Sequence, residues 1–163
     1  MTQHPRLMSP LSLRGQTLRN RIVFGAHTAN MSDQGLPGPR FEGYILERAL
    51  GGAAMIVAEP MPVHRTGVLT RGNYVHSDDA VIPGFRKITD KVKDAVITSK
   101  IKSRLGSEPS LSGLVITVET QNGRVALRGS APDRAAADRA ASIARTVDGV
   151  SSIDNQLAVV VKP

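Results

Sequence analysis

The spacing of hydrophobic and polar positions changes near Asp90. Before it, two short apolar runs, residues 21–24 and 55–58, flank a segment in which apolar residues recur at helical spacing. Unbroken apolar runs of this length are typical of parallel strands covered on both faces. After it, residues 91–163 contain two helical patterns and three strand patterns of their own. The sequence therefore predicts two domains, residues 1–90 and residues 91–163.

The first part has the pattern of a β/α fold. A hairpin over residues 11–18 precedes the first strand, residues 41–49 predict a helix that Gly51 and Gly52 end, and another helix opens at Pro83 after a long irregular stretch. In β/α folds the carboxyl ends of the strands carry the ligand site. The residues at those two ends are therefore candidates for binding: Ala26, His27 and Thr28 after the first strand, Glu59 and Pro60 after the second.

The second part predicts a complete αββαβ unit, a three-stranded sheet covered by two helices. Strands over residues 114–120 and 124–129 flank Asn122-Gly123, a pair that tolerates the positive φ angles of tight hairpins, and Gly129 is expected to end the second strand. A helix over residues 132–147 and a closing strand over residues 153–161 complete the unit. Its apolar stripe is expected at Ala136, Ala140, Ile143, Ala144 and Val147. Its first helix continues in phase from the helix at Pro83, which predicts one helix over residues 84–105.

Composition narrows the range of functions. The 163 residues contain no Cys, which excludes disulfides, thiolate metal sites and a Cys nucleophile. The formal net charge of +7 would suit anionic partners, but it is spread over both parts. Only two Tyr and three Phe are present and no Trp, so we expect no specific nucleic-acid binding through stacked bases. The four His have no partners at metal-ligand spacing, so no metal site is predicted.

The first part resembles the old yellow enzyme family of NADH:flavin oxidoreductases. The residues that carry the resemblance are Leu18-Arg19-Asn20-Arg21-Ile22-Val23, Tyr44, Glu47-Arg48-Ala49, Gly51-Gly52-Ala53-Ala54-Met55-Ile56-Val57 and Ile82-Pro83-Gly84-Phe85. The family implies an FMN-bearing (β/α)8 barrel that passes hydride from NAD(P)H through the flavin to a substrate. By the same resemblance Ala26, His27, Thr28, Glu59 and Pro60 would be vestigial FMN contacts.

Most of such a barrel has no counterpart in these residues. A (β/α)8 barrel has eight strands in about 250 residues, whereas the first part supplies two strands and so predicts a truncated barrel fragment. Two parallel strands leave open edges, which predicts association with a further copy or another chain. We expect no cofactor in this chain, with FMN implied by resemblance only, and no enzyme activity as the chain stands. The alternative is an FMN-binding oxidoreductase fragment whose missing strands come from another chain.

The second part resembles the BON domain. The resemblance rests on Asp94-Ala95-Val96-Ile97-Thr98, Ile101-Lys102, residues 118–120 and 122–129, and the closing pattern Ala140, Ala144, Val147-Asp148-Gly149-Val150, Ile153-Asp154-Asn155. Such domains are non-catalytic modules that bind phospholipid or other ligands and hold assemblies at membranes. The resemblance implies anionic phospholipid or another protein as partner. The candidate lipid contacts are the lysines of its first helix: Lys91, Lys93, Lys100 and Lys102.

The chain shows no signal-peptide pattern and no apolar run of about 20 residues, so we expect a cytoplasmic protein, peripheral to a membrane where it binds one. The leading hypothesis is a non-catalytic BON-type binding module fused to an incomplete flavin oxidoreductase segment.

Overall fold

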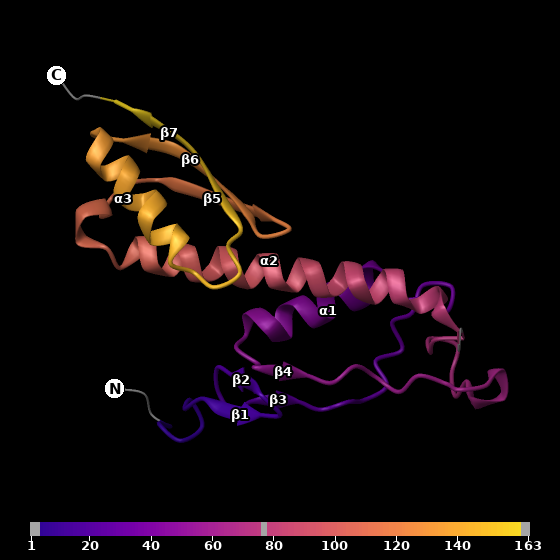
Figure 1. Ribbon diagram of the computed structural model, residues 1–163. Helices are drawn as coiled ribbons and strands as arrows, with labels where there is room; N and C mark the ends of the chain where they lie inside the picture. Colours follow the sequence, from indigo (N-terminus) through magenta and orange to yellow (C-terminus); the bar gives the residue numbers. More distant parts are fainter. Residues whose placement is uncertain (1–3, 76–77, 161–163) are drawn as a thin grey trace. The chain divides into compact units, whose positions relative to one another are not determined.

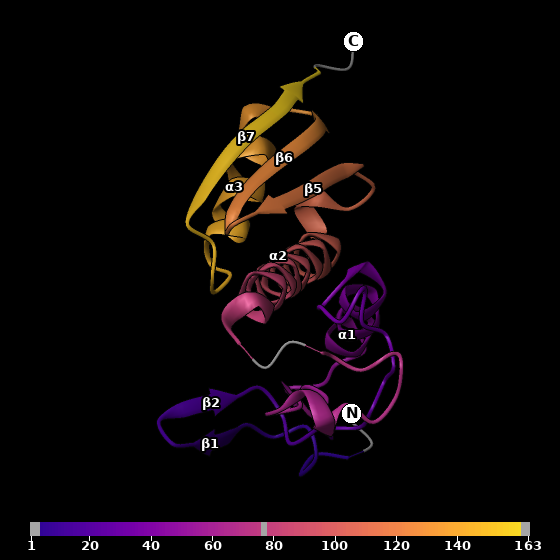
Figure 2. The same ribbon diagram turned by 90° about the vertical axis from the view of Figure 1, so that its right-hand side faces the viewer.

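The computed structural model describes residues 4–75 and 78–160. The chain divides into two compact units, Met1–Thr89 and Asp90–Pro163, which we call unit 1 and unit 2. Figure 1 and Figure 2 show the elements of each unit. His76 and Val161, which the sequence placed in a loop and in the last strand, lie outside the described residues.

Unit 1 contains a small hairpin and a parallel pair of strands. Strands β1 (Leu11–Leu13) and β2 (Gln16–Leu18) pair antiparallel. Strand β3 (Val23–Phe24) leads through helix α1 (Pro39–Leu50) to strand β4 (Met55–Ile56), which pairs parallel with β3. Within the described residues this two-stranded parallel sheet gains no third strand, and no barrel is closed. The predicted β/α segment is confirmed as an open one.

Two polar side chains fix α1 to the start of β3. The Arg19 guanidinium donates hydrogen bonds to the carbonyl oxygens of Ala49 and Ala53 at 2.8 and 3.0 Å. The Asn20 amide donates to the Gly52 carbonyl at 2.9 Å, and its own oxygen accepts the Ile22 N–H at 2.9 Å. Carbonyls at the C-terminus of a helix lack partners within the helix, so this pair caps α1 and aligns β4 beside β3.

Helix α2 (Ile82–Gly106) is continuous across the boundary between the units, as the sequence predicted for residues 84–105. Its first turns belong to unit 1. There Phe85 lies edge-on to Phe41 of α1 and to Tyr74, with ring centroids 6.1 and 5.5 Å apart. Phe41 and Tyr74 are buried, so this aromatic cluster forms the centre of unit 1.

Unit 2 is a three-stranded sheet with helices on one face. The strand order is β5 (Ile116–Gln121), β6 (Arg124–Ala131), β7 (Ser152–Val159), with β5 antiparallel and β7 parallel to β6. Helix α3 (Arg134–Arg145) connects β6 to β7 and lies on the same face as the end of α2 (Figures 1 and 2). A 3-10 turn, Pro109–Leu111, follows α2. The predicted αββαβ unit is confirmed.

The core of unit 2 is small and aliphatic. Its buried members come from both helices and from strands β5 and β6, and the partly buried Ile153 and Leu157 of β7 pack against them. These buried members are Ile97, Ile101 and Leu105 from α2, Val118, Val125 and Leu127 from the sheet, and Ala140, Ala141 and Ala144 from α3, with Leu111 and Val147. Asp133 begins α3 by accepting the Ala136 N–H at 2.7 Å. The buried stripe of α3 includes Ala137 and Ala141, which the sequence did not single out. Alanine on this face lets the helix approach the sheet closely.

Gly129 does not end β6, so that prediction was wrong. The strand continues to Ala131, and Gly129 lies inside it with φ of +130°. A Cβ atom at this position would lie 2.3 Å from the carbonyl oxygen of Val115 on the neighbouring segment. The glycine therefore permits a close approach of two backbones within the sheet.

Candidate functional site

The predicted binding residues of unit 1 gather at one edge of the parallel sheet. Because β3 and β4 run parallel, residues 26–28 and residues 59–60 leave the sheet on the same side. The Glu59 carboxylate joins the two exits: its Oε2 accepts the backbone N–H of Ala29 at 2.9 Å. Ala26, His27 and Pro60 are exposed, Thr28 is half-buried, and Glu59 is only 4% exposed.

An aromatic and cationic group lies beside this edge. His27 Nε2 and Tyr44 Oη share a hydrogen bond of 2.6 Å, and the rings of Phe24 and His27 are edge-on at 5.4 Å. The Arg48 guanidinium stacks over the Tyr44 ring at 3.5 Å and lies 5.6 Å from the Phe24 ring. Cation–π contacts of this kind orient a guanidinium at low cost, so α1 presents a positive charge next to the exit of β3.

Glu59 and Tyr74 are two buried polar residues of unit 1. Tyr74 is fully buried, and neither its hydroxyl nor Glu59 Oε1 has a hydrogen-bond partner of good geometry among the described residues. Burial raises the pKa of the Tyr74 hydroxyl above its ordinary value, and the charge of Glu59 raises that pKa further. The raised pKa keeps the Tyr74 phenol neutral at physiological pH. No sequence pattern pointed to Tyr74, because it lies in an irregular stretch without periodicity.

In unit 2, Asp94 connects α2 to the β5–β6 hairpin. Its two carboxylate oxygens accept the backbone N–H groups of Asn122 and Gly123 at 2.7 and 2.9 Å. These are the two central residues of the turn, and both have positive φ, 51° and 74°. One turn further along α2, the Thr98 hydroxyl donates to the Thr120 hydroxyl at 2.7 Å. One side of α2 is thus fixed to strand β5.

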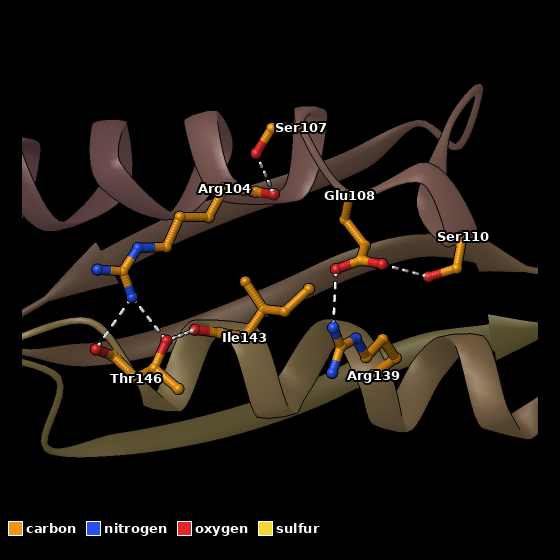
Figure 3. A network of polar contacts seen from close by, with 7 residues as sticks. All are labelled: Arg104, Ser107, Glu108, Ser110, Arg139, Ile143 and Thr146. Carbon is orange, nitrogen blue, oxygen red and sulfur yellow. Dashed lines mark hydrogen bonds and ion pairs between the residues drawn. The ribbon is translucent and has the colours of Figure 1, made fainter.

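The other side of α2 is fixed to α3 by the network in Figure 3. Arg104 reaches from α2 to the C-terminal end of α3, where it donates to the carbonyl and the hydroxyl of Thr146 at 3.1 and 2.6 Å. Glu108 lies between Arg139 and Ser110 and accepts hydrogen bonds from them at 2.9 and 3.0 Å. The hydrogen bond from Arg139, followed by that from Ser110, lowers the pKa of the Glu108 carboxyl.

The four candidate lysines of α2 do not share one side of the helix. Lys91 and Lys102 are about three turns apart and lie on the side that faces β5, whereas Lys93 and Lys100 are about two turns apart and lie on the opposite side. Lys93 forms an ion pair with Asp90 at 3.7 Å. Between the two pairs, on the helix face turned away from the core of unit 2, the sequence places small residues: Val92, Ala95, Val96, Ser99 and Ser103.

The uncovered face of the unit 2 sheet carries side chains that already satisfy one another. Arg128 on β6 binds Glu119 on β5 at 2.5 Å and the side-chain oxygen of Gln156 on β7 at 2.9 Å. The Gln156 amide donates to Asp154 at 2.6 Å. This row of polar contacts crosses all three strands and mixes one cation with two carboxylates, so it is polar and offers no unpaired positive charge.

Comparison with known proteins identifies a family for the N-terminal region of the chain. Residues 6–108, more than half of the chain, match the NADH:flavin oxidoreductase / NADH oxidase family. The chain belongs to this family. It is 35% identical over 89 residues to a probable N-methylproline demethylase of Rhizobium meliloti (strain 1021), which covers 54% of this chain and 13% of that protein. It is 30% identical over 91 residues to the NADPH dehydrogenase of Bacillus subtilis (strain 168), covering 55% of this chain and 27% of that protein.

The C-terminal region of the chain, residues 93–161, matches the BON domain. Over 64 residues it is 42% identical to osmotically-inducible protein Y of Escherichia coli (strain K12), which covers 39% of this chain and 32% of that protein. The chain thus spans less than a third of the length of each of these three relatives. The two family matches overlap over residues 93–108, which lie in α2 and the turn that follows it. The predicted composition, a flavin oxidoreductase segment and a BON domain, is confirmed.

The flavin oxidoreductase family implies FMN, and the residues at the β3–β4 edge do not by themselves fit that group. The Glu59 carboxylate is turned toward Ala29 and the interior, and the other four candidates, Ala26, His27, Thr28 and Pro60, offer no fixed positive charge for a phosphate. They make one wall of a binding site.

The described residues contain neither a metal-type cluster nor a helix suited to span a membrane. Within residues 4–75 and 78–160, no three His, Asp or Glu side chains gather as a metal site would require. In the same residues, no helix combines the length and the apolar character that a membrane crossing needs.

Proposed function

We propose that this chain is a binding protein that attaches through its BON domain, residues 91–163, to an anionic phospholipid surface. The flavin oxidoreductase segment, residues 1–90, carries no redox activity of its own in this proposal. The observation that supports it best is the contrast between the units: unit 2 has a complete sheet, a closed aliphatic core and two fixed helices, whereas unit 1 has a two-stranded parallel sheet.

The surface that suits such a partner is the outward face of α2. Small residues along this face are bordered on one side by Lys91 and Lys102 and on the other by Lys93 and Lys100. Lysines at the borders of an interfacial helix extend their charged ends to the headgroups while their aliphatic stems cover the apolar strip. Each contributes on the order of 1 kcal/mol near an anionic membrane.

The other faces of unit 2 suit this role less well. On the open sheet face, Arg128 is held by Glu119 and Gln156. On α3, Arg139 is held by Glu108 and Arg134 by Asp138 at 3.3 Å. A cation already paired with a carboxylate gains less from an anionic surface, since it must give up that partner or share it, and the same cost applies to Lys93 beside Asp90 on the α2 face.

Sedimentation with vesicles tests the proposal. The full chain is mixed at low salt with phosphatidylserine–phosphatidylcholine vesicles and with phosphatidylcholine vesicles alone. We expect partition into the anionic vesicles only. The double variant Lys100→Gln/Lys102→Gln removes one lysine from each border and should weaken partition roughly 30-fold, from two contributions of about 1 kcal/mol each.

The matched control removes two charges from α3, as Arg134→Gln/Arg145→Gln, and should weaken partition less than about threefold because these residues lie away from the α2 face. An equal loss in both double variants would mean that net charge, not this face, governs binding. Failure of the parent chain to partition into anionic vesicles would remove the lipid proposal.

A second candidate function is flavin binding by a barrel that another chain completes. It is favoured by the apolar face of the β3–β4 sheet: Val23, Met55 and Val57 are 48%, 36% and 38% exposed. Parallel sheets in α/β proteins are covered on both faces, and these side chains are uncovered within unit 1. Purification together with a flavin-bearing partner would support this candidate. A single species of one chain without flavin would exclude it.

A further inference from the structure

We propose that β7 is the surface through which two copies of this chain associate: the outer edge of β7 pairs antiparallel with the same edge of a second copy, centred on Asn155. The three-stranded sheets of the two copies then form one continuous sheet. The inference concerns an edge of the BON domain and does not depend on the lipid proposal, which uses α2.

Strand β7 is an edge strand without the features that usually block pairing. It lies outermost in the order β5-β6-β7, and within the described residues no strand pairs with its outer side (Figures 1 and 2). Edge strands of soluble proteins are commonly protected by lysine, proline, a bulge or a very short length. The eight residues of β7, Ser152–Val159, include no Lys, Arg, Pro or Gly. The strand therefore offers a row of backbone groups to a further strand.

The outward backbone groups belong to every second residue of β7. The Val160 N–H donates to the Ala131 carbonyl of β6 at 2.9 Å, so the alternation of the strand turns the N–H and C=O groups of Val159 and Leu157 outward. The Leu157 N–H is bonded to the side-chain oxygen of Asn155 in its own strand, at 3.4 Å. Ordinary N–H···O bonds are about 2.9 Å long, so a carbonyl of a second strand would replace a weak contact with a normal one.

The side chains of β7 match one another when two copies pair about Asn155. Ile153 then lies opposite Leu157 on the helix-covered face, and Asp154 lies opposite Gln156 on the open face. Apolar cross-strand pairs stabilise a sheet, and like charges directly opposite each other destabilise it. Asp154 is the single charged residue of β7, so this pairing sets no two charges directly opposite. Pairing about Gln156 would instead place Asn155 opposite Leu157, a polar residue against an apolar one.

On the open face, Asp154 and Gln156 have hydrogen-bonding capacity left for a second copy. The Gln156 amide donates to Asp154 of the same strand at 2.6 Å, and its oxygen accepts from Arg128 at 2.9 Å. A side-chain amide carries two N–H groups, and a carboxylate accepts several hydrogen bonds. The second N–H of Gln156 is therefore a donor for Asp154 of the second copy.

The core of unit 2 is incompletely covered at the same edge. Val125 and Leu127 of β6 are 1% and 0% exposed, whereas Ile153 and Leu157 of β7 are half-buried and Val159 is 43% exposed. Removing apolar surface from water is favourable in proportion to its area. Pairing of the two β7 strands brings the apolar residues of both copies together and so covers this part of the core.

Sedimentation velocity of the full chain over a concentration series tests the inference. We expect the parent chain to change reversibly from monomer to dimer as its concentration rises. Gln156→Glu keeps the acceptor for Arg128 and places a carboxylate opposite Asp154 at both symmetric positions. It should raise the dissociation constant of the dimer about tenfold. A parent chain that stays monomeric up to about 1 mM would overturn the inference.

Gln121→Glu is the matched control. Gln121 is exposed at the end of β5, the opposite edge of the same sheet, and its replacement changes the net charge by the same amount. It should leave the dissociation constant within about twofold. An unchanged dissociation constant in Gln156→Glu, or an equal change in both variants, would place the contact elsewhere on the chain and overturn the inference.

Disulfide cross-linking decides the matter if Gln156→Glu does not fold. The chain has no cysteine, so the single variants Asp154→Cys and Gln156→Cys carry one thiol each. Cβ atoms directly opposite in an antiparallel pair lie close to the separation that a disulfide needs. Under mild oxidation, a mixture of the two variants should give a linked dimer of one chain of each, identified by mass, in higher yield than either variant alone. No linked dimer, equal yields in all samples, or preferred self-linking of either variant would overturn the inference.

Discussion

Replacement of Asp94 by alanine should destabilise unit 2 without affecting unit 1. Asp94 accepts the two central N–H groups of the β5–β6 turn at 2.7 and 2.9 Å and so connects α2 to the hairpin. The variant removes both acceptors and leaves the backbone N–H groups of Asn122 and Gly123 without side-chain partners. Both turn residues keep the positive φ angles that the hairpin requires.

The magnitude follows from the exposure of the groups involved. Hydrogen bonds to charged groups contribute about 1.5–3 kcal/mol each when fully protected. Asp94 is half-buried and Asn122 is exposed, so water replaces part of what is lost. Alanine also favours the helix by a few tenths of a kcal/mol. We expect a net loss of about 2 kcal/mol, which corresponds to roughly 8–16 °C for a unit of this size.

The chain offers separate reporters for the two units. Both tyrosines, Tyr44 and Tyr74, lie before the boundary at Thr89, and the sequence contains no tryptophan. Tyrosine fluorescence therefore follows unit 1, while far-ultraviolet circular dichroism follows both units. In a thermal or urea titration of the full chain, Asp94→Ala should lower the midpoint of the unit 2 component and leave the fluorescence transition in place.

Asp90→Ala is the control, because it removes an aspartate from the same helix one turn earlier. Asp90 makes an exposed ion pair with Lys93 at 3.7 Å, and its loss should cost less than about 0.5 kcal/mol. A change below about 0.5 kcal/mol in Asp94→Ala itself would refute the reasoning, since the two turn contacts would then contribute nothing beyond a surface pair.

Three further predictions concern single residues. Gly129→Ala should destabilise unit 2 by about 2 kcal/mol or more, because φ is +130° there and a Cβ would lie 2.3 Å from a carbonyl oxygen; Gly106→Ala, which meets open space, should be nearly neutral by the same urea titration. Arg139 lowers the pKa of Glu108, so the ionised Glu108 carboxylate contributes to the stability of unit 2 above about pH 4.5. This stabilisation should disappear as the pH falls through the folded-state pKa, and Glu108→Gln should flatten that pH dependence. For Tyr74 the pKa is raised, so the pH dependence of stability runs the other way. Stability measured by circular dichroism should decline as the pH rises above about 10, and it should decline less in Tyr74→Phe.

The fold of unit 2 could be predicted closely because its signals are local. Asn122 and Gly123 adopt the positive φ angles that their types favour, and Asp133 takes the N-cap position at the start of α3. The alanine-rich stripe of α3 was predicted only in part, since Ala contrasts weakly with its polar neighbours. Gly129 was misjudged because the contact that requires it comes from a segment distant in sequence, which no local pattern reveals.

The candidate site of unit 1 was predictable to the level of strand ends. Parallel strands place their carboxyl ends at one edge, and so residues 26–28 lie near Glu59. That Glu59 is buried, and that Tyr74 packs against Phe41, depends on tertiary packing and could not be read from spacing. The division of the four α2 lysines into two borders, by contrast, follows from helical geometry alone.

The measurement that tests the account most directly is the flavin content of the full chain. The protein is saturated with FMN, freed of unbound flavin by gel filtration, and measured for flavin absorbance per chain and for flavin released on denaturation. We predict no stoichiometric flavin and no oxidation of NADH, with vesicle binding intact in the same preparation. One FMN retained per chain and reduced by NADH would contradict the assignment of this protein as a binding module.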